Sequence, residues 1–182
     1  MEILFITGNK EKIAIANTIL NKENIKVEAK KIECPEIQSD DNEIIAKESA
    51  KYASNITQKN VIKIDTGFYI EELNGFPGPY AEYVERKLDA LDILKMMENK
   101  KNRKAYYKEV LAYCEYKREP IAFTTYTYGR ISEKLSGEKG YNFDRIFICD
   151  KDDKTMANYE QEERAQKYSN ENWKKLVKYL KK

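Results

Sequence analysis

Residues 61–80 constrain the fold of this chain more than any other stretch. A short apolar run leads directly into Asp65, Thr66 and Gly67, and a turn rich in proline and glycine closes the stretch. A strand that ends in a carboxylate and then bends at a glycine is typical of α/β enzymes, which hold catalytic and metal-binding acids there. We therefore expect Asp65 at the C-terminal end of a buried strand, a bend at Gly67, and a short partner strand over 68–72.

The absence of histidine limits the chemistry that this chain can perform. The sequence contains no histidine among 182 residues, so imidazole bases, histidine metal ligands and Ser-His triads are excluded. Catalysis must then rest on carboxylates, lysines and a metal ion. Cys34, Cys114 and Cys149 are widely spaced and form no CxxC pair, which argues against a zinc site or a disulfide framework. A reduced, cytoplasmic location fits this cysteine usage best.

Length and charge set the class of protein. A chain of 182 residues is long enough for one substantial core, and we expect a single domain over 1–182. The net charge of +2 is the difference between 33 basic and 31 acidic side chains, so no overall basic field favours nucleic acid as a partner. No apolar run approaches the length of a membrane span. Residues 1–6 are interpreted as a core strand and not as a signal peptide.

Hydrophobic periodicity predicts alternating strands and helices in the first half of the chain. We expect strands over 3–6 and 25–32, with a helix over 10–20 between them. A second helix starts near 40–42, and a third follows the 61–80 stretch. The residues expected on the apolar face of the second helix are Ile45, Ser49, Tyr52 and Ile56. Those expected to mark the third are Leu88, Leu91 and Leu94.

The second half of the chain favours strands and one closing helix. Segments 105–116 and 121–130 are rich in Tyr, Thr, Phe and Val and predict a hairpin. Their aromatic alternation is interpreted as sheet packing in preference to a nucleic-acid platform. A short strand over 145–149 precedes an amphipathic helix that begins near Trp173. The fold class is therefore α/β, a mixed sheet flanked by helices with an antiparallel extension.

The segment 7–12, Thr-Gly-Asn-Lys-Glu-Lys, is the first candidate site. It connects the first strand to the first helix, where unpaired N–H groups and the helix dipole favour an anion. Gly8 permits close approach of a phosphate, and Lys12 adds a positive charge. The alternative is an ordinary strand-to-helix turn with surface lysines.

Three further segments carry candidate polar or aromatic groups. The pair Asp65 and Thr66 could form a Mg²⁺ site, because this ion binds few carboxylates and keeps several waters. The alternative is that the Asp65 side chain caps a turn. Glu36 could be a second carboxylate beside Asp65. The alternative is that it is an exposed glutamate in a loop. In segment 140–144, Tyr141 or Phe143 could stack on a base, and Asp144 could accept a hydrogen bond from a base N–H. The alternative is that the two aromatic residues belong to the core and that Asp144 belongs to a turn.

Taken together, these motifs resemble the inosine triphosphate pyrophosphatase family. The segments that match run in family order from about residue 3 to residue 147. They are Thr7-Gly8-Asn9 with Lys12, Glu36, Lys51, Asp65-Thr66-Gly67, Asn74 to Tyr80, Arg103 with Ala105-Tyr106, and Gly140 to Asp144 before Ile146-Phe147.

The resemblance implies an elongated α/β fold with two lobes around a central cleft, and a homodimer. It implies cleavage of non-standard purine nucleoside triphosphates between the α and β phosphates, with Mg²⁺, or Mn²⁺ in its place, as cofactor. Asp65 would be the catalytic base and, with Glu36, the metal ligand. Lys12 and Lys51 would neutralise the triphosphate. The further substrate contacts implied are Thr7, Gly8, Asn9, Lys10, Thr66, Tyr141, Asn142, Phe143, Asp144, Arg164 and Ser169.

The C-terminal region departs from the family pattern. Members of the family carry a lysine followed shortly by Ser-His-Arg, which reads the 6-oxo edge of the purine. Here Arg164 takes the place of the lysine, and Ser169 is followed by Asn170 and Glu171. A shift of one residue would align Tyr168-Ser169-Asn170 with the motif instead. In both alignments the His-Arg pair is missing, which bears on base choice and leaves the phosphate chemistry untouched.

Three hypotheses follow from the sequence. The first is a Mg²⁺-dependent pyrophosphatase of non-standard purine nucleoside triphosphates. The second is a pyrophosphatase with a shifted base preference, which the altered C-terminal motif motivates. The third is a nucleotide-binding protein that has lost useful catalysis, against which the retained Glu36, Asp65, Lys12 and Lys51 argue.

Overall fold

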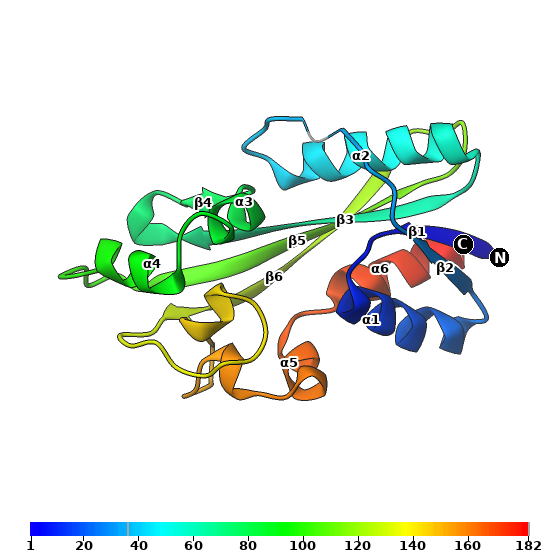
Figure 1. Ribbon diagram of the computed structural model, residues 1–182. Coiled ribbons are helices and arrows are strands. Elements are labelled where there is room, and N and C mark those ends of the chain that lie inside the picture. Colours follow the sequence, from blue (N-terminus) through cyan, green and yellow to red (C-terminus); the bar gives the residue numbers. More distant parts are fainter. Residues whose placement is uncertain (36, 182) are drawn as a thin grey trace. The chain divides into compact units, whose positions relative to one another are not determined.

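The computed structural model describes residues 1–35 and 37–181. It contains a seven-stranded mixed sheet with strand order β2-β1-β3-β5-β6-β7, and β4 pairs with β3 outside this path. The chain divides into two compact units, one formed by 1–65, 109–125 and 170–182 and the other by 66–108 and 126–169. Three strands, β3, β5 and β6, contribute residues to both. The predicted α/β class, a mixed sheet flanked by helices, is confirmed (Figure 1).

The first unit begins with a β-α-β segment. Strand β1 (Glu2–Ile6) pairs in parallel with β2 (Lys26–Lys30) and with the start of β3. Helix α1 (Lys10–Leu20) connects β1 to β2 and packs beside the C-terminal helix α6 (Glu171–Leu180) (Figure 1). The core beneath them includes Ile3, Phe5, Ala16, Leu20, Ile62, Ile64, Trp173 and Leu176. The bounds predicted for α1 are confirmed.

Helix α2 (Asn42–Thr57) packs through a different face than the sequence predicted. Ile45 and Ser49 are buried as expected, whereas Tyr52 and Ile56 are 41% and 52% exposed. The cluster against β1, β3 and β5 uses small residues instead, namely Ala46, Ala50 and Ala53. Because alanines allow the helix backbone to approach the sheet closely, they displace the larger side chains to the rim of the contact.

Strand β3 (Val61–Ile70) is one continuous strand of ten residues. The predicted bend at Gly67 is therefore wrong, and Asp65 lies in the middle of the strand, not at its C-terminal end. Residues 68–70 continue the strand. The partner is β4 (Pro77–Gly78), which pairs Gly78 with Phe68. Gly67 is buried within the strand, directly before Phe68, which pairs with Gly78 of β4.

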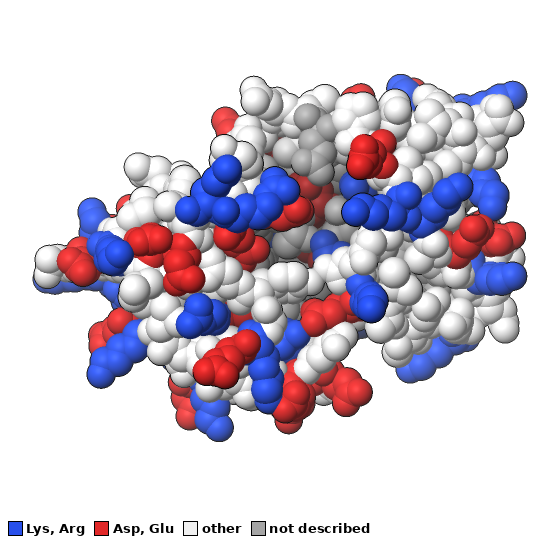
Figure 2. Space-filling model, viewed as in Figure 1, with Lys and Arg blue, Asp and Glu red and all other residues white. Residues whose placement is uncertain are grey.

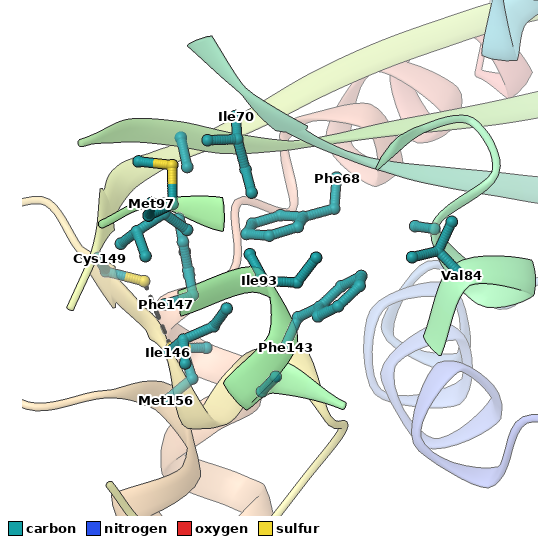
Figure 3. Close-up of a cluster of buried hydrophobic side chains, with 14 residues drawn as sticks. Phe68, Ile70, Val84, Ile93, Met97, Phe143, Ile146, Phe147, Cys149 and Met156 are labelled. Atoms are coloured by element: carbon teal, nitrogen blue, oxygen red, sulfur yellow. Dashed lines mark hydrogen bonds between the residues drawn. The ribbon is translucent and has the colours of Figure 1, made fainter. Parts of the chain in front are cut away.

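The second unit has its own core beneath two short helices, α3 (Ala81–Glu85) and α4 (Ala90–Met96). Figure 3 shows Phe68 and Ile70 of β3 facing Ile93, Phe143 and Phe147. The sequence placed Leu88, Leu91 and Leu94 on one helix. In the structure Leu91 is exposed, and Ala90 and Ile93 are the buried residues of α4. Leu88 lies before α4, because the helix begins at the Asp89 cap, which forms a capping box with Asp92.

The predicted hairpin is confirmed as β5 (Lys104–Cys114) and β6 (Ile121–Ile131), with β7 (Phe147–Cys149) antiparallel to β6. Along β6, Thr125 and Thr127 are buried while Tyr126 and Tyr128 are exposed. The two tyrosine rings stack at 5.7 Å, and Tyr106 of β5 contacts both. The aromatic alternation thus forms a cross-strand ladder, as the sheet-packing interpretation expected.

The C-terminal region contains two helices where the sequence predicted one. Helix α5 (Gln161–Lys167) is separated from α6 by residues 168–170. Arg164 on α5 is buried, so this segment is not simply the solvated start of the closing helix. Short 3₁₀ turns occupy Asn21–Glu23, Glu71–Leu73, Phe143–Arg145 and Met156–Asn158.

Acidic and basic side chains are interspersed on the face shown in Figure 2. This pattern agrees with the net charge of +2, because no large area of one sign gathers there. In residues 1–35 and 37–181, no helix is both long and apolar enough to cross a membrane.

Trp173 should carry much of the stability of the first unit. It is buried on α6, and its ring meets Phe5 edge-on at 5.6 Å. We expect Trp173→Ala to lower the free energy of unfolding by about 3–5 kcal/mol. The neighbouring Lys174→Ala, which removes only an exposed ion pair with Glu171, should change it by less than about 1 kcal/mol. Urea unfolding of both variants tests this, and equal effects would contradict the assignment of α6 to the core.

Candidate active site

The loop between β1 and α1 is fixed by its own side chains. Asn9 caps α1, since its Oδ1 accepts hydrogen bonds from the backbone N–H groups of Glu11 and Lys12 at 2.9 and 3.1 Å. The Thr7 hydroxyl accepts from the Asn9 N–H at 3.1 Å. Two of the N–H groups expected to bind an anion are therefore used by the cap. What the loop presents to solvent is Gly8 and Lys10, which are exposed, and the partly exposed Lys12.

Asp65 is oriented by a side chain that the sequence did not reveal. The Asn42 amide at the first residue of α2 donates a hydrogen bond to Asp65 Oδ2. Asn42 is fully buried and Asp65 is partly buried on β3. The sequence placed a helix start near 40–42, but nothing in it indicated that this helix begins against Asp65. Glu36, the expected second carboxylate, lies outside the described residues.

The donor set of the described residues is compatible with Mg²⁺. No group of three or more acidic or cysteine side chains gathers as a metal cluster within 1–35 and 37–181. Mg²⁺ needs only one or two carboxylates and keeps several waters. The Asp65 carboxylate supplies an oxygen ligand of the type that this ion prefers. The Asn42 amide donates a hydrogen bond to that carboxylate, as groups around metal ligands commonly do.

Lys51 lies elsewhere on α2. Nine positions separate it from Asn42, which corresponds to about 14 Å along the helix axis. Its ammonium pairs with Glu119, at the turn between β5 and β6, at 2.8 Å. This carboxylate raises the pKa of Lys51 through its hydrogen bond and charge. The structure therefore pairs Lys51 with Glu119 and not with Asp65, and its contact with a triphosphate stays a prediction.

The segment 140–144 in the second unit presents one aromatic ring to solvent. Tyr141 is 42% exposed, whereas Phe143 is 1% exposed and stacks on Phe68 at 5.1 Å (Figure 3). Asn142 is used to hold α4: its Oδ1 accepts from the Ala90 N–H and its amide donates to the Leu88 carbonyl. Of the two aromatic rings in this segment, that of Tyr141 is the exposed one, and its contact with a base stays a prediction.

Asp144 is buried in a network of hydrogen bonds. Its Oδ1 accepts from the Tyr168 hydroxyl at 2.6 Å, and its Oδ2 accepts from the Tyr141 N–H at 2.9 Å. Arg164 places its Nε 3.6 Å from Oδ2 and donates to the Tyr159 carbonyl. Burial raises the pKa of Tyr168 well above its ordinary value, so its hydroxyl remains a donor. The structure thus brings Asp144 and Arg164 together in a buried pair, and their contact with a substrate stays a prediction.

Hydrogen bonds to distant residues anchor two segments of the second unit. The Glu85 carboxylate on α3 accepts a hydrogen bond from the Phe143 N–H at 3.0 Å. The Ser169 N–H donates to the Thr127 hydroxyl at 2.9 Å, and Thr66 is partly exposed on β3 beside Asp65. Sequence reasoning missed Glu85 and Tyr168, because each acts through a partner more than twenty positions away and no local pattern marks that pairing.

A mixed sheet with a carboxylate oriented on β3 and a capped loop after β1 defines an α/β protein with a polar site on its first unit. Comparison with known proteins gives the family. The chain belongs to the Ham1 family, whose sequence model matches residues 3–173.

Two relatives of this chain carry the same name. The chain is 42% identical over 165 residues to the dITP/XTP pyrophosphatase of Methanopyrus kandleri, covering 91% of this chain and 88% of that protein. It is 43% identical over 146 residues to the dITP/XTP pyrophosphatase of Methanosarcina acetivorans, covering 80% and 79%. The resemblance expected from the motifs is therefore confirmed.

Solved structures agree with this assignment. The Ham1 protein of Staphylococcus aureus is 27% identical, with a TM-score of 0.84 over 100% of this chain and 98% of that one. The HAM1 protein of Coxiella burnetii shares the fold at 21% identity, with a TM-score of 0.87 over 100% and 98%.

Gly140 should be required for the network around Asp144. Its φ is +78°, and a Cβ there would overlap Oδ2 of Asp144 and press on the Arg164 guanidinium. Gly75 has a similar φ of +84°, but its nearest neighbour would be Tyr69 at 3.5 Å. We expect Gly75→Ala to cost about 1–2 kcal/mol for the left-handed conformation alone, and Gly140→Ala to cost distinctly more. Urea unfolding measures both, and a smaller loss for Gly140→Ala would contradict this account.

Glu85 should make stability depend on pH. Burial raises its pKa; the Phe143 N–H bond lowers it in part, and nearby Asp144 raises it again. A carboxyl whose pKa is higher in the folded state stabilises the fold when protonated, and that contribution is lost as pH rises. We expect Glu85→Gln to gain stability over the wild type as pH increases from 4 to 7.

The matched control is Glu133→Gln, an exposed glutamate of the same unit. Thermal unfolding across this pH range should show no growing advantage for the control. A Glu85→Gln advantage that stays constant with pH would contradict the role of burial.

Proposed function

We propose that this chain hydrolyses non-standard purine nucleoside triphosphates, such as dITP, XTP and ITP, to the monophosphate and pyrophosphate. The observation that carries the proposal is 42% identity over 91% of the chain to a protein named dITP/XTP pyrophosphatase. The oriented carboxylate of Asp65 and the lysine-bearing loop after β1 support it. Neither requires histidine, which fits a sequence that has none.

In this proposal water attacks the α phosphorus and the bond to the bridging oxygen breaks, releasing pyrophosphate. Asp65 and Glu36 would hold Mg²⁺, or Mn²⁺ in its place, and the ion would supply neutralising charge. Asp65 orients the attacking water and accepts its proton. Lys12, with the loop over 7–10, balances the negative charge of the triphosphate. Lys51 adds positive charge when its ammonium leaves the Glu119 carboxylate and pairs with a phosphate. Such transfer depends on positioning and charge more than on covalent help from the protein.

Base recognition is assigned to the second unit. Tyr141 provides the exposed ring for stacking on a purine. Asp144 and Arg164 hold the segment that presents it, while Tyr168 and Ser169 are already engaged by Asp144 and Thr127. Because the segment 168–171 lacks a His-Arg pair, a shifted base preference is the second candidate. A pocket that lacks donors rejects a wrong base less strongly.

We further propose a homodimer in a reduced, cytoplasmic setting. The exposed ladder of Tyr126 and Tyr128 supports association, because tyrosine is enriched at protein interfaces. Cys34, Cys114 and Cys149 form no disulfide with one another, which supports the reducing compartment. Light scattering after size exclusion should give the mass of two chains, and a single-chain mass at micromolar concentration would remove the dimer from the proposal.

A substrate panel tests the activity. Purified protein with Mg²⁺ should release pyrophosphate from dITP, XTP and ITP with kcat/KM at least about tenfold above that for dATP, dGTP, dCTP and dTTP. A pyrimidine or amino-bearing base at the top of the ranking would establish the shifted preference instead. No turnover of any triphosphate with Mg²⁺ or Mn²⁺ would overturn the proposed function.

Asp65→Asn separates catalysis from binding. It keeps the size of the side chain and removes the carboxylate charge, so we expect kcat to fall by about a thousandfold or more. Triphosphate binding, measured by calorimetry, should persist at reduced affinity. Tight binding without turnover in the wild type would favour the nucleotide-binding hypothesis.

A further inference from the structure

We infer that Asn42 is a positioning residue for Asp65, an inference that rests on the proposed role of Asp65 in catalysis. The Asn42 amide donates to Asp65 Oδ2 from a side chain that is 0% exposed. The sequence motifs do not mark Asn42. The contact joins the first residue of α2 to the middle of β3.

The position of Asn42 is fixed by the start of its helix. Asp41 caps α2, and its Oδ1 accepts from the Glu43 N–H at 2.9 Å. The Asp41 N–H in turn donates to the Ser39 hydroxyl at 3.1 Å. Farther along, Ala46 and Ala50 pack the helix against the sheet. Asn42 therefore approaches Asp65 from a backbone that is held on both sides.

In this contact Asn42 can act only as the donor and Asp65 only as the acceptor. An asparagine NH₂ group is purely a donor, and an ionised carboxylate is purely an acceptor. A hydrogen bond at Oδ2 therefore suits the anionic form of Asp65 and fixes the plane of its carboxylate. A fixed plane is what a metal ion or an attacking water requires, because rotation of the acid would move its oxygens out of line. Removing a residue that supports a metal ligand typically costs about 10–100-fold in metal affinity or activity.

A buried amide can also be purely structural, and α2 offers a matched comparison. Ser54 is likewise 0% exposed, and its hydroxyl donates to the Lys59 carbonyl at 2.8 Å. It lies three turns farther along the same helix and away from Asp65. Ser54→Ala removes one buried hydrogen bond from α2, as Asn42→Leu does, without changing the surroundings of the carboxylate.

The experiment compares Asn42→Leu, which keeps the size of the side chain and removes its donors, with Ser54→Ala. We expect Asn42→Leu to lower kcat by about 10–100-fold with little change in the KM for dITP, and to weaken Mn²⁺ binding, followed by electron paramagnetic resonance, by a similar factor. Ser54→Ala should lower the melting temperature but leave kcat and Mn²⁺ affinity unchanged. Equal kcat and Mn²⁺ affinity in both variants would overturn the inference.

A measurement on the wild type keeps the inference testable if Asn42→Leu fails to fold. The side-chain NH₂ signals of Asn42 in a ¹⁵N-labelled sample should shift when Mg²⁺ is added, and should move again in Asp65→Asn. Signals indifferent to both changes would overturn the inference. If the wild type turns over no triphosphate, the proposed function fails, and the Mn²⁺ and amide readouts still decide the role of Asn42.

Discussion

The unbroken strand β3 is the constraint on which the first unit depends. Its two-residue period directs Ile62 and Ile64 into the core shared with α1 and α6, and Val61 into the cluster under α2. Asp65 is in phase with Val61, so it must face the side of the sheet that α2 covers. A carboxylate there needs a donor, and the first residue of α2 supplies it. The orientation of the acid is thus a consequence of strand phase and helix start together.

The second unit satisfies its polar groups by a different arrangement, centred on one buried anion. Asp144 accepts hydrogen bonds from Tyr168 and from the Tyr141 backbone, and Arg164 lies beside it. A buried charge is tolerated only when it is paired and hydrogen-bonded. Glycine at 140 leaves room for these partners. The same contacts that satisfy Asp144 hold the Tyr141 ring at the surface, so folding and ring presentation share one set of interactions.

The sequence predicted what depends on local pattern. Helix 10–20 and the hairpin strands followed from periodicity and turn residues, and both are present. It failed where the outcome depends on a distant partner. The extension of β3 through Gly67 requires β4, and the buried face of α2 follows from how closely alanines approach the sheet. In the candidate site, Asn42, Glu85 and Tyr168 were missed for the same reason, since only the folded chain brings each to its hydrogen-bond partner.

The residues proposed for catalysis and those proposed for base binding belong to different units. The carboxylate and its supporting amide belong to the first unit, whereas Tyr141, Asp144 and Arg164 belong to the second. In the segment 168–170, the Tyr168 hydroxyl donates to Asp144 and the Ser169 N–H donates to Thr127, both within the second unit. Groups already paired in this way contribute little to reading a base, since breaking them would leave buried partners unsatisfied. A substitution in that segment would therefore act on the fold of the second unit and leave the surroundings of Asp65 unchanged, because the two regions are stabilised by separate contacts.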